Sequence, residues 1–228
     1  MTSRNPLIRA LLLCVLTAPV AVVSHARDSF PDATDDGLAR VDAKKADAVY
    51  WREGATLDQY SRILLLDCEV SFRKNWARDH NRESRTLDGR VSDRDVMRIK
   101  SELAEEFGSV FREELSEDGG FELVDELAND VLVLRPAIVN LDVTAPDLRT
   151  ASRTRSFVES AGQMTLILEF YDGVTGDIIG RVIDDREDTR KGFAQRADSV
   201  TNRAAADRIL KSWASSLREA LVEAGMTP

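Results

Sequence analysis

Histidine content sets the first limit on the chemistry that this chain could perform. The sequence contains two histidines, His25 and His80, and His25 lies in an amino-terminal segment that we expect to be removed. A site that needs two histidines is therefore excluded from the processed chain, and no nucleophile motif stands beside His80. We interpret His80 as a solvated loop histidine, and we expect no catalytic residue, no bound metal and no cofactor.

Carboxylates are the plentiful reactive groups, with 40 acidic against 31 basic residues and a net charge of −9. The densest run, 184–188, lacks the oxygen spacing of a calcium loop, and we interpret it as a solvated charge run. Asp67 and Glu69 share one face of an expected strand, and Asn140 and Asp142 could face them from a neighbour. Paired carboxylates hydrolyse glycosidic bonds when a cleft holds them at a fixed separation. A carboxylate-dependent glycan hydrolase is therefore an alternative function.

Arginine and tryptophan gather between residues 73 and 91, which we expect to be a long charged loop. These two residue types are enriched at interface hot spots. We predict a partner-binding surface for an anionic protein, glycan or lipid headgroup; the alternative is a mobile charged loop. The acidic balance argues against nucleic acid as the partner. The predicted surface comprises Trp76, Arg78 and Arg82, together with Arg153 and Arg155 from a second polar loop.

The first 26 residues, Met1 to Ala26, have the pattern of a secretory signal peptide. Two arginines precede an apolar run over 10–23, which is short for a membrane span, and small residues at 24 and 26 suit a signal peptidase. We therefore expect an exported, periplasmic protein whose mature chain begins at Arg27.

Two cysteines occur in the chain. Cys14 lies in the apolar core of the signal, so Cys68 would remain alone, and we predict that it is a buried strand residue. An outer-membrane lipoprotein acylated at Cys14 is an alternative, although Leu13 and the apolar residues that follow fit a lipid-attachment motif poorly.

Hydrophobic periodicity indicates the remaining organisation. Residues 27–59 are expected to form a flexible leader with an aromatic docking segment that contains Tyr50 and Trp51. Tyr60 follows directly and is expected to help dock the leader onto the domain. A single α+β domain follows over 60–225, with about five strands in a mostly antiparallel or mixed sheet and two amphipathic helices on one face. The expected strands cover 62–72, 121–126, 131–143, 163–172 and 178–184. The first expected helix begins at a capping box over 92–95, and the second covers 204–224.

Within those strands, period-two alternation assigns Leu64, Leu66, Cys68, Val70 and Phe72 to the core face of the first one. In the strand over 131–143, a proline cannot donate to a sheet ladder, so we expect an edge or a bulge at Pro136.

Three segments resemble the uncharacterised bacterial envelope proteins grouped as domain of unknown function 3313. They are Tyr60–Leu65, Phe121–Asp125 before the long strand, and the hairpin Glu169–Asp177. The resemblance implies a small exported α+β domain, often lipid-anchored, in a Gram-negative envelope, and it supplies no catalytic residues. We therefore expect a non-enzymatic accessory or binding protein.

Overall fold

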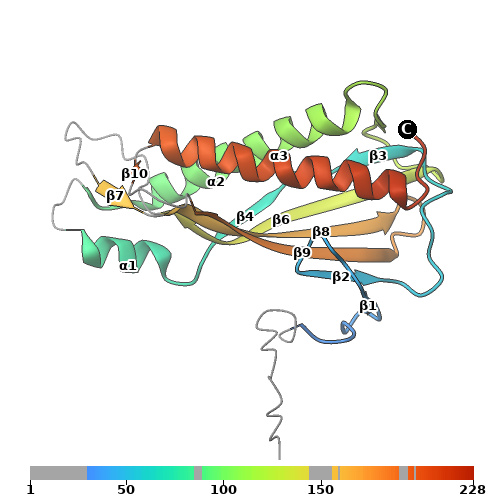
Figure 1. Cartoon of the computed structure of the whole chain (residues 1–228), viewed down its shortest axis with the longest axis horizontal. Helices are drawn as coiled ribbons and strands as arrows, with labels where there is room; N and C mark the ends of the chain where they lie inside the picture. Colours follow the sequence, from blue (N-terminus) through green and yellow to red (C-terminus); the bar gives the residue numbers. More distant parts are fainter. Residues whose placement is uncertain (1–29, 85–88, 144–155, 159, 190–194, 198) are drawn as a thin grey trace, which may run out of the picture.

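A computed structural model describes residues 30–84, 89–143, 156–158, 160–189, 195–197 and 199–228. One large sheet carries two long helices on one face, and a third, short helix lies at the end of the sheet (Figure 1). The expected α+β class is confirmed, and the sheet is mixed as expected, but it contains eight strands where about five were predicted.

Strand order explains the mixture of directions. The sheet runs β1-β2-β9-β8-β6-β3-β5, and β4 pairs with β6 beside β3. The β3–β5, β3–β6 and β4–β6 pairs are parallel and the others are antiparallel. The strands are β1 (Ala39–Val41), β2 (Ala48–Trp51), β3 (Arg62–Leu65), β4 (Glu69–Phe72), β5 (Glu122–Leu123), β6 (Val131–Val143), β8 (Ser160–Asp172) and β9 (Ile178–Thr189). A separate pair joins β7 (Ser156–Val158) to β10 (Gln195–Ala197).

The long helices α2 (Asp93–Ser116) and α3 (Ser199–Glu223) cover one face of the sheet. α2 begins with the predicted capping box, in which Ser92 and Asp95 satisfy each other's backbone N–H groups. α3 begins five residues before the predicted start, at Ser199 instead of Ala204. Its predicted apolar stripe is buried except for Val222, which is 49% exposed. No helix among the described residues combines the length and apolar composition needed to cross a bilayer.

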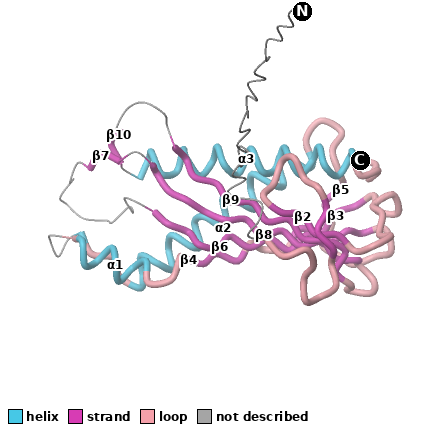
Figure 2. Tube along the Cα trace, turned by 60° about the horizontal axis from the view of Figure 1, so that its bottom comes forward, coloured by secondary structure: helices cyan, strands magenta, loops and turns pink. Residues whose placement is uncertain are grey.

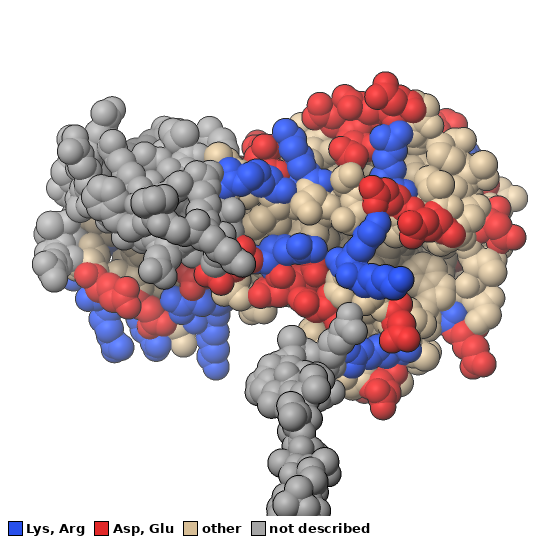
Figure 3. All heavy atoms as spheres, in the orientation of Figure 1, with Lys and Arg blue, Asp and Glu red and all other residues tan. Residues whose placement is uncertain are grey.

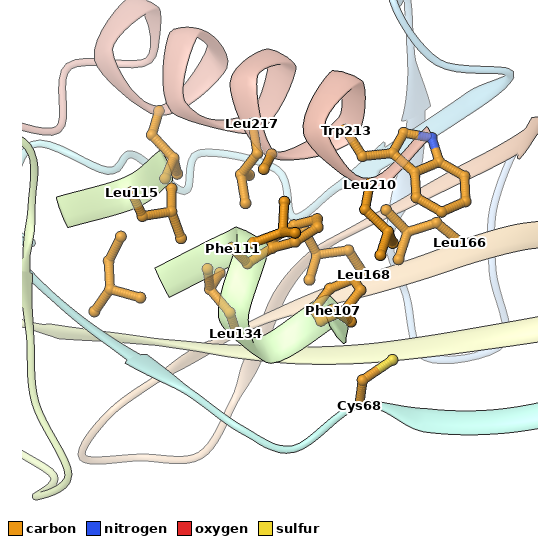
Figure 4. Packing of buried hydrophobic residues seen from close by; sticks show 14 of the residues in the cluster. Cys68, Phe107, Phe111, Leu115, Leu134, Leu166, Leu168, Leu210, Trp213 and Leu217 are labelled. Carbon is orange, nitrogen blue, oxygen red and sulfur yellow. The ribbon is translucent and has the colours of Figure 1, made fainter. Parts of the chain in front are cut away.

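The main core lies between these helices and the sheet, as Figure 4 shows. Phe107 and Phe111 of α2 stack with ring centroids 3.8 Å apart, and both are fully buried. Leu166 and Leu168 of β8 meet them from the sheet. Burial of such apolar area is the dominant favourable term in folding, so this cluster fixes the frame on which every other feature is mounted.

The strand expected over 62–72 is two strands, and the prediction of its core face was half wrong. Cys68, Val70 and Phe72 do face the main core, but Leu66 is 40% exposed in the break between β3 and β4. Leu64 is buried in a second cluster with Val131 and Val133. The break shifts the alternation by one residue, so β3 uses odd positions and β4 even positions for the core.

The same break accommodates Pro136. β6 is an interior strand, and its register with β8 shifts after Val139 and not at Pro136, so the expected edge or bulge at Pro136 was wrong. β3 pairs with β6 up to Leu134 and β4 pairs from Ala137 onward. Pro136 therefore lies where neither strand needs its missing N–H group.

Two predicted irregular regions contain regular structure. The leader supplies β1 and β2 to the sheet, and Tyr50 and Tyr60 are buried. β2 docks because Trp51 covers Gly180 of β9 and packs edge-on against Phe170 at 5.5 Å. The loop expected over 73–91 contains the helix α1 (Trp76–Glu83), so His80 is a half-buried helix residue and not a loop residue.

Candidate functional site

α1 is fixed at the end of the sheet by Trp76. Both orientations place this helix at one end of the molecule, away from the carboxyl terminus (Figure 2). Asn75 takes a left-handed conformation, with φ 64°, and turns the chain out of β4 into the helix. Trp76 is 2% exposed, stacks on Phe72 at 4.0 Å, and donates its indole N–H to the carbonyl of Val143 at 3.3 Å.

The helix separates the residues of the predicted surface. Positions 76, 80 and 83 recur at four- and three-residue steps, so Trp76, His80 and Glu83 share one face of α1. Arg78 and Arg82 are exposed on the other face. Figure 3 shows basic side chains projecting from the molecule where α1 lies, next to acidic ones. Trp76 thus packs the helix against the sheet. Its buried ring does not share an exposed surface with Arg78 and Arg82, so the predicted common surface is divided.

A polar pocket of about 270 Å³ lies beside the inner face of α1. Residues from five parts of the chain meet there: the segment after β4, α1 itself, and the ends of β6, β8 and β9. The lining consists of Arg73, Trp76, His80, Glu83, Asp142, Val143, Gly162, Gln163 and Glu187.

Ion pairs hold the basic wall of this pocket. Arg73 donates from Nε to Asp142 and from a terminal nitrogen to Asp79 at 3.3 Å. The hydrogen bond to Asp142, and then the charge of that carboxylate, raise the pKa of Arg73. Gln163 donates its amide to Asp185 at 2.8 Å. Arg73 and Gln163 are therefore positioned by neighbouring carboxylates before any ligand arrives.

The carboxylates that were predicted to act together are separated. Asp142 lines the pocket but binds Arg73, whereas neither Asp67 nor Glu69 is part of the lining. Within the described ranges, no three side chains of histidine, cysteine, aspartate or glutamate are grouped so that they could hold a metal ion. The structure therefore offers no support for the carboxylate pair on which the hydrolase alternative rested.

Two other predictions have different outcomes. Cys68 is buried as expected, but it lies in the break between β3 and β4 and not in a strand. Burial raises the pKa of its thiol to about 12. The run 184–188 is not wholly solvated, because Asp184 is 5% exposed and accepts a hydrogen bond from the Trp213 indole at 2.7 Å. Arg153 and Arg155 lie outside the described residues.

The sequence analysis did not identify Glu83, Gln163 and Glu187 as pocket residues. Only the spacing of Trp76, His80 and Glu83 could have indicated a shared helical face, and that spacing has no meaning unless α1 is recognised as a helix. Gln163 and Glu187 reach the pocket through strand pairing alone, since they are direct partners in the β8–β9 register.

Comparison with protein families gives a clear assignment. The model of a family described as protein of unknown function (DUF3313) matches residues 32–217. The chain belongs to this family. The match includes β1, β2 and the whole pocket lining, so the DUF3313 domain begins well before the predicted boundary at residue 60. No curated protein matches the chain.

Several solved structures are distantly similar to this DUF3313 protein. Protein XCC0632 from Xanthomonas campestris has a TM-score of 0.40 at 9% identity and covers 75% of this chain and 89% of its own. The PelC dodecamer from Paraburkholderia phytofirmans has a TM-score of 0.35 at 11% identity, covering 75% and 96%. A putative neuraminyllactose-binding hemagglutinin homolog from Helicobacter pylori has 0.32 at 13% identity, covering 80% and 94%. Likenesses this distant carry no argument about what the chain does.

Proposed function

We propose that this protein is an exported periplasmic accessory or binding protein that acts through a surface and not by catalysis. The observation that carries the proposal is the outer face of α1. Arg78 has 60% of its side chain exposed and Arg82 is also exposed, while buried Trp76 fixes the helix that presents them. Export rests on the signal-peptide pattern of residues 1–26.

A fixed helix makes these arginines better binding groups than a loop would. Ordering a long side chain or a loop on binding costs free energy, and a preformed helix avoids part of that cost. Arginine presents planar N–H donors that match carboxylate and phosphate oxygens. The outer face of α1 therefore suits an anionic group on an envelope protein, a glycan or a lipid headgroup.

Capture from envelope fractions tests the proposal. The mature chain, from Arg27 onward, is crosslinked in a periplasmic extract, and the captured material is compared with that of the Arg78→Ala/Arg82→Ala variant. Arg94→Ala/Arg112→Ala is the matched control, because these arginines are exposed on α2.

We expect capture to be lost in the α1 variant and retained in the control, with equal circular dichroism spectra for all three proteins. Equal capture by all three would refute the outer face of α1 as the binding surface.

A further inference from the structure

The pocket on the inner face of α1 is lined by more negative than positive side chains, with Glu83, Asp142 and Glu187 against Arg73. The side chains of Glu83 and Glu187 form no ion pair or hydrogen bond with another described residue. Asp142 uses Oδ2 for Arg73, and Gln163 uses its amide nitrogen for Asp185, which leaves one oxygen of each side chain. An ionised carboxylate accepts and cannot donate.

The positive charge of the lining is already paired. Arg73 is held by Asp142 and Asp79, and these two carboxylates offset its charge. The amide of Gln163 already donates to Asp185. Arg73 and Gln163 keep further N–H groups, and His80 offers a ring N–H, so the lining does not lack donors. What it lacks is a positive partner for Glu83 and Glu187, and a ligand that complements it must therefore bring positive charge.

The burial of the lining residues also favours a cationic ligand. Trp76 is buried and Val143 and His80 are half-buried, whereas Glu83, Gln163 and Glu187 are exposed. Phe72, Trp76 and His80 form a stacked series of rings, with centroids 4.0 Å and 5.6 Å apart. Aromatic rings attract cations through their quadrupole, and guanidinium groups stack on ring faces. Carboxylates at the mouth with rings beneath them are complementary to a positively charged nitrogen group.

Size limits the ligand further. A volume of about 270 Å³ is at or below the lower end of the roughly 300–1,000 Å³ of drug-sized sites. The space therefore suits one side-chain-sized group and not a large cofactor. The net charge of −9 favours the approach of cations to the whole molecule.

We propose that the pocket between α1 and the ends of β6, β8 and β9 binds an ammonium or guanidinium group. The group donates to Glu83 and Glu187 across the mouth and lies over the His80 end of the ring series. A free polyamine and a lysine or arginine side chain of another protein share this chemistry. The site is independent of Arg78 and Arg82, which point away on the opposite face of α1.

NMR titration of the mature chain tests this site directly. The probes are spermidine, acetyl-lysine amide and acetyl-arginine amide, with acetyl-norleucine amide as the uncharged comparison. His80 is the single histidine after residue 26, so its ring signals identify the site without ambiguity. We expect cationic probes to shift the His80 ring and the Trp76 indole signals, and to do so less as salt rises from 50 to 500 mM.

Charge removal at constant shape identifies the groups that bind. Glu83→Gln/Glu187→Gln is expected to weaken cation binding by at least about tenfold, which corresponds to about 1.4 kcal/mol. Glu113→Gln/Asp118→Asn removes two exposed charges from the end of α2 and is expected to leave binding unchanged.

The pattern of probes separates the two sources of the cation. Binding of spermidine alone indicates a free polyamine, and binding of the amino-acid amides indicates a protein side chain. Binding of no cation at millimolar concentration, equal binding of the norleucine amide, or equal weakening by the α2 variant would each overturn the proposal. Loss of envelope capture in the Arg78→Ala/Arg82→Ala variant with unchanged cation binding would show that the two faces of α1 act separately.

Discussion

Trp76 shows how residue type alone misleads about function. Tryptophan beside arginine is the composition of an interface hot spot, and it is also the composition of a short helix that needs one large anchor. The structure decides between these readings, because Trp76 is 2% exposed while Arg78 and Arg82 face outward. The separation of Trp76 from the two arginines follows from a helical period that the sequence did not reveal.

Trp76 should therefore contribute to stability and the two arginines should not. Replacing a buried aromatic residue by alanine typically costs about 3–5 kcal/mol, so we expect a loss of that order for Trp76→Ala. Exposed substitutions usually change stability by no more than about 0.5 kcal/mol, and we expect Arg78→Ala/Arg82→Ala to stay in that range. Urea unfolding followed by circular dichroism measures both. A stable Trp76→Ala protein would contradict the anchoring role.

The hydrogen-bonded carboxylate of Asp172 should make the stability of the protein depend on pH in the acid range. Its carboxylate accepts from the backbone N–H of Thr175, the hydroxyl of Tyr60 and the N–H of Val174, at 2.7, 2.7 and 2.9 Å. These bonds lower its pKa to about 2, whereas an unfolded aspartate has a pKa of about 3.9. The unfolded state therefore binds the proton first as the pH falls.

Stability from Asp172 should be fully present above about pH 4 and be lost as the pH falls toward 2. We expect the urea midpoint of the wild-type chain to fall over this window more steeply than that of Asp172→Asn. Asp177→Asn, an exposed change in the same turn, is the control. Parallel pH profiles for wild type and Asp172→Asn would contradict this assignment.

Elements with a long, regular period were predictable, and short elements that depend on tertiary contacts were not. The bounds of β6 match the prediction, and α2 starts at its capping box, because each carries its own pattern over at least 13 residues. α1 has eight residues and β1 has three, so neither has a repeat long enough to read. The break at Leu66 was hidden because apolar residues occupy both parities of that strand. The pocket could not be predicted, because strand pairing alone brings Gln163 and Glu187 to Arg73.

The docking of β2 onto β9 depends on a position that cannot carry a side chain. A Cβ atom on Gly180 would lie 2.2 Å from Cε3 of Trp51, well inside van der Waals contact. We expect Gly180→Ala to cost about 1–3 kcal/mol by displacing Trp51 from Phe170. In a Trp51→Ala background the same change should cost much less, since the clashing ring is gone. Urea unfolding of the four proteins of this cycle measures the coupling, and additive costs would contradict it.

At the scale of the whole molecule, the architecture places its long helices on one face of the sheet and its pocket beyond the end of that layer. Leu166 and Leu168 turn one side of β8 into the core, while Gln163 and Glu169 lie on the other parity with charged partners. Apolar packing and charged contacts are thus divided between the two faces of β8. The family match over residues 32–217 spans both parts, so the domain includes the edge strands that the sequence pattern assigned to a leader.

The amino terminus determines where this surface works, and mass spectrometry of the protein purified from a bacterial envelope fraction identifies it. We expect a mature chain that starts with free Arg27, because small residues precede it at the positions that a signal peptidase reads. Phe30 packs against the cluster of Leu38 and Tyr50. Cleavage at Ala26 would release the chain without a lipid anchor, and α1 would meet diffusing partners. An acylated Cys14 would contradict this start and would attach the chain to a membrane. The outer-face arginines would then work within reach of lipid headgroups.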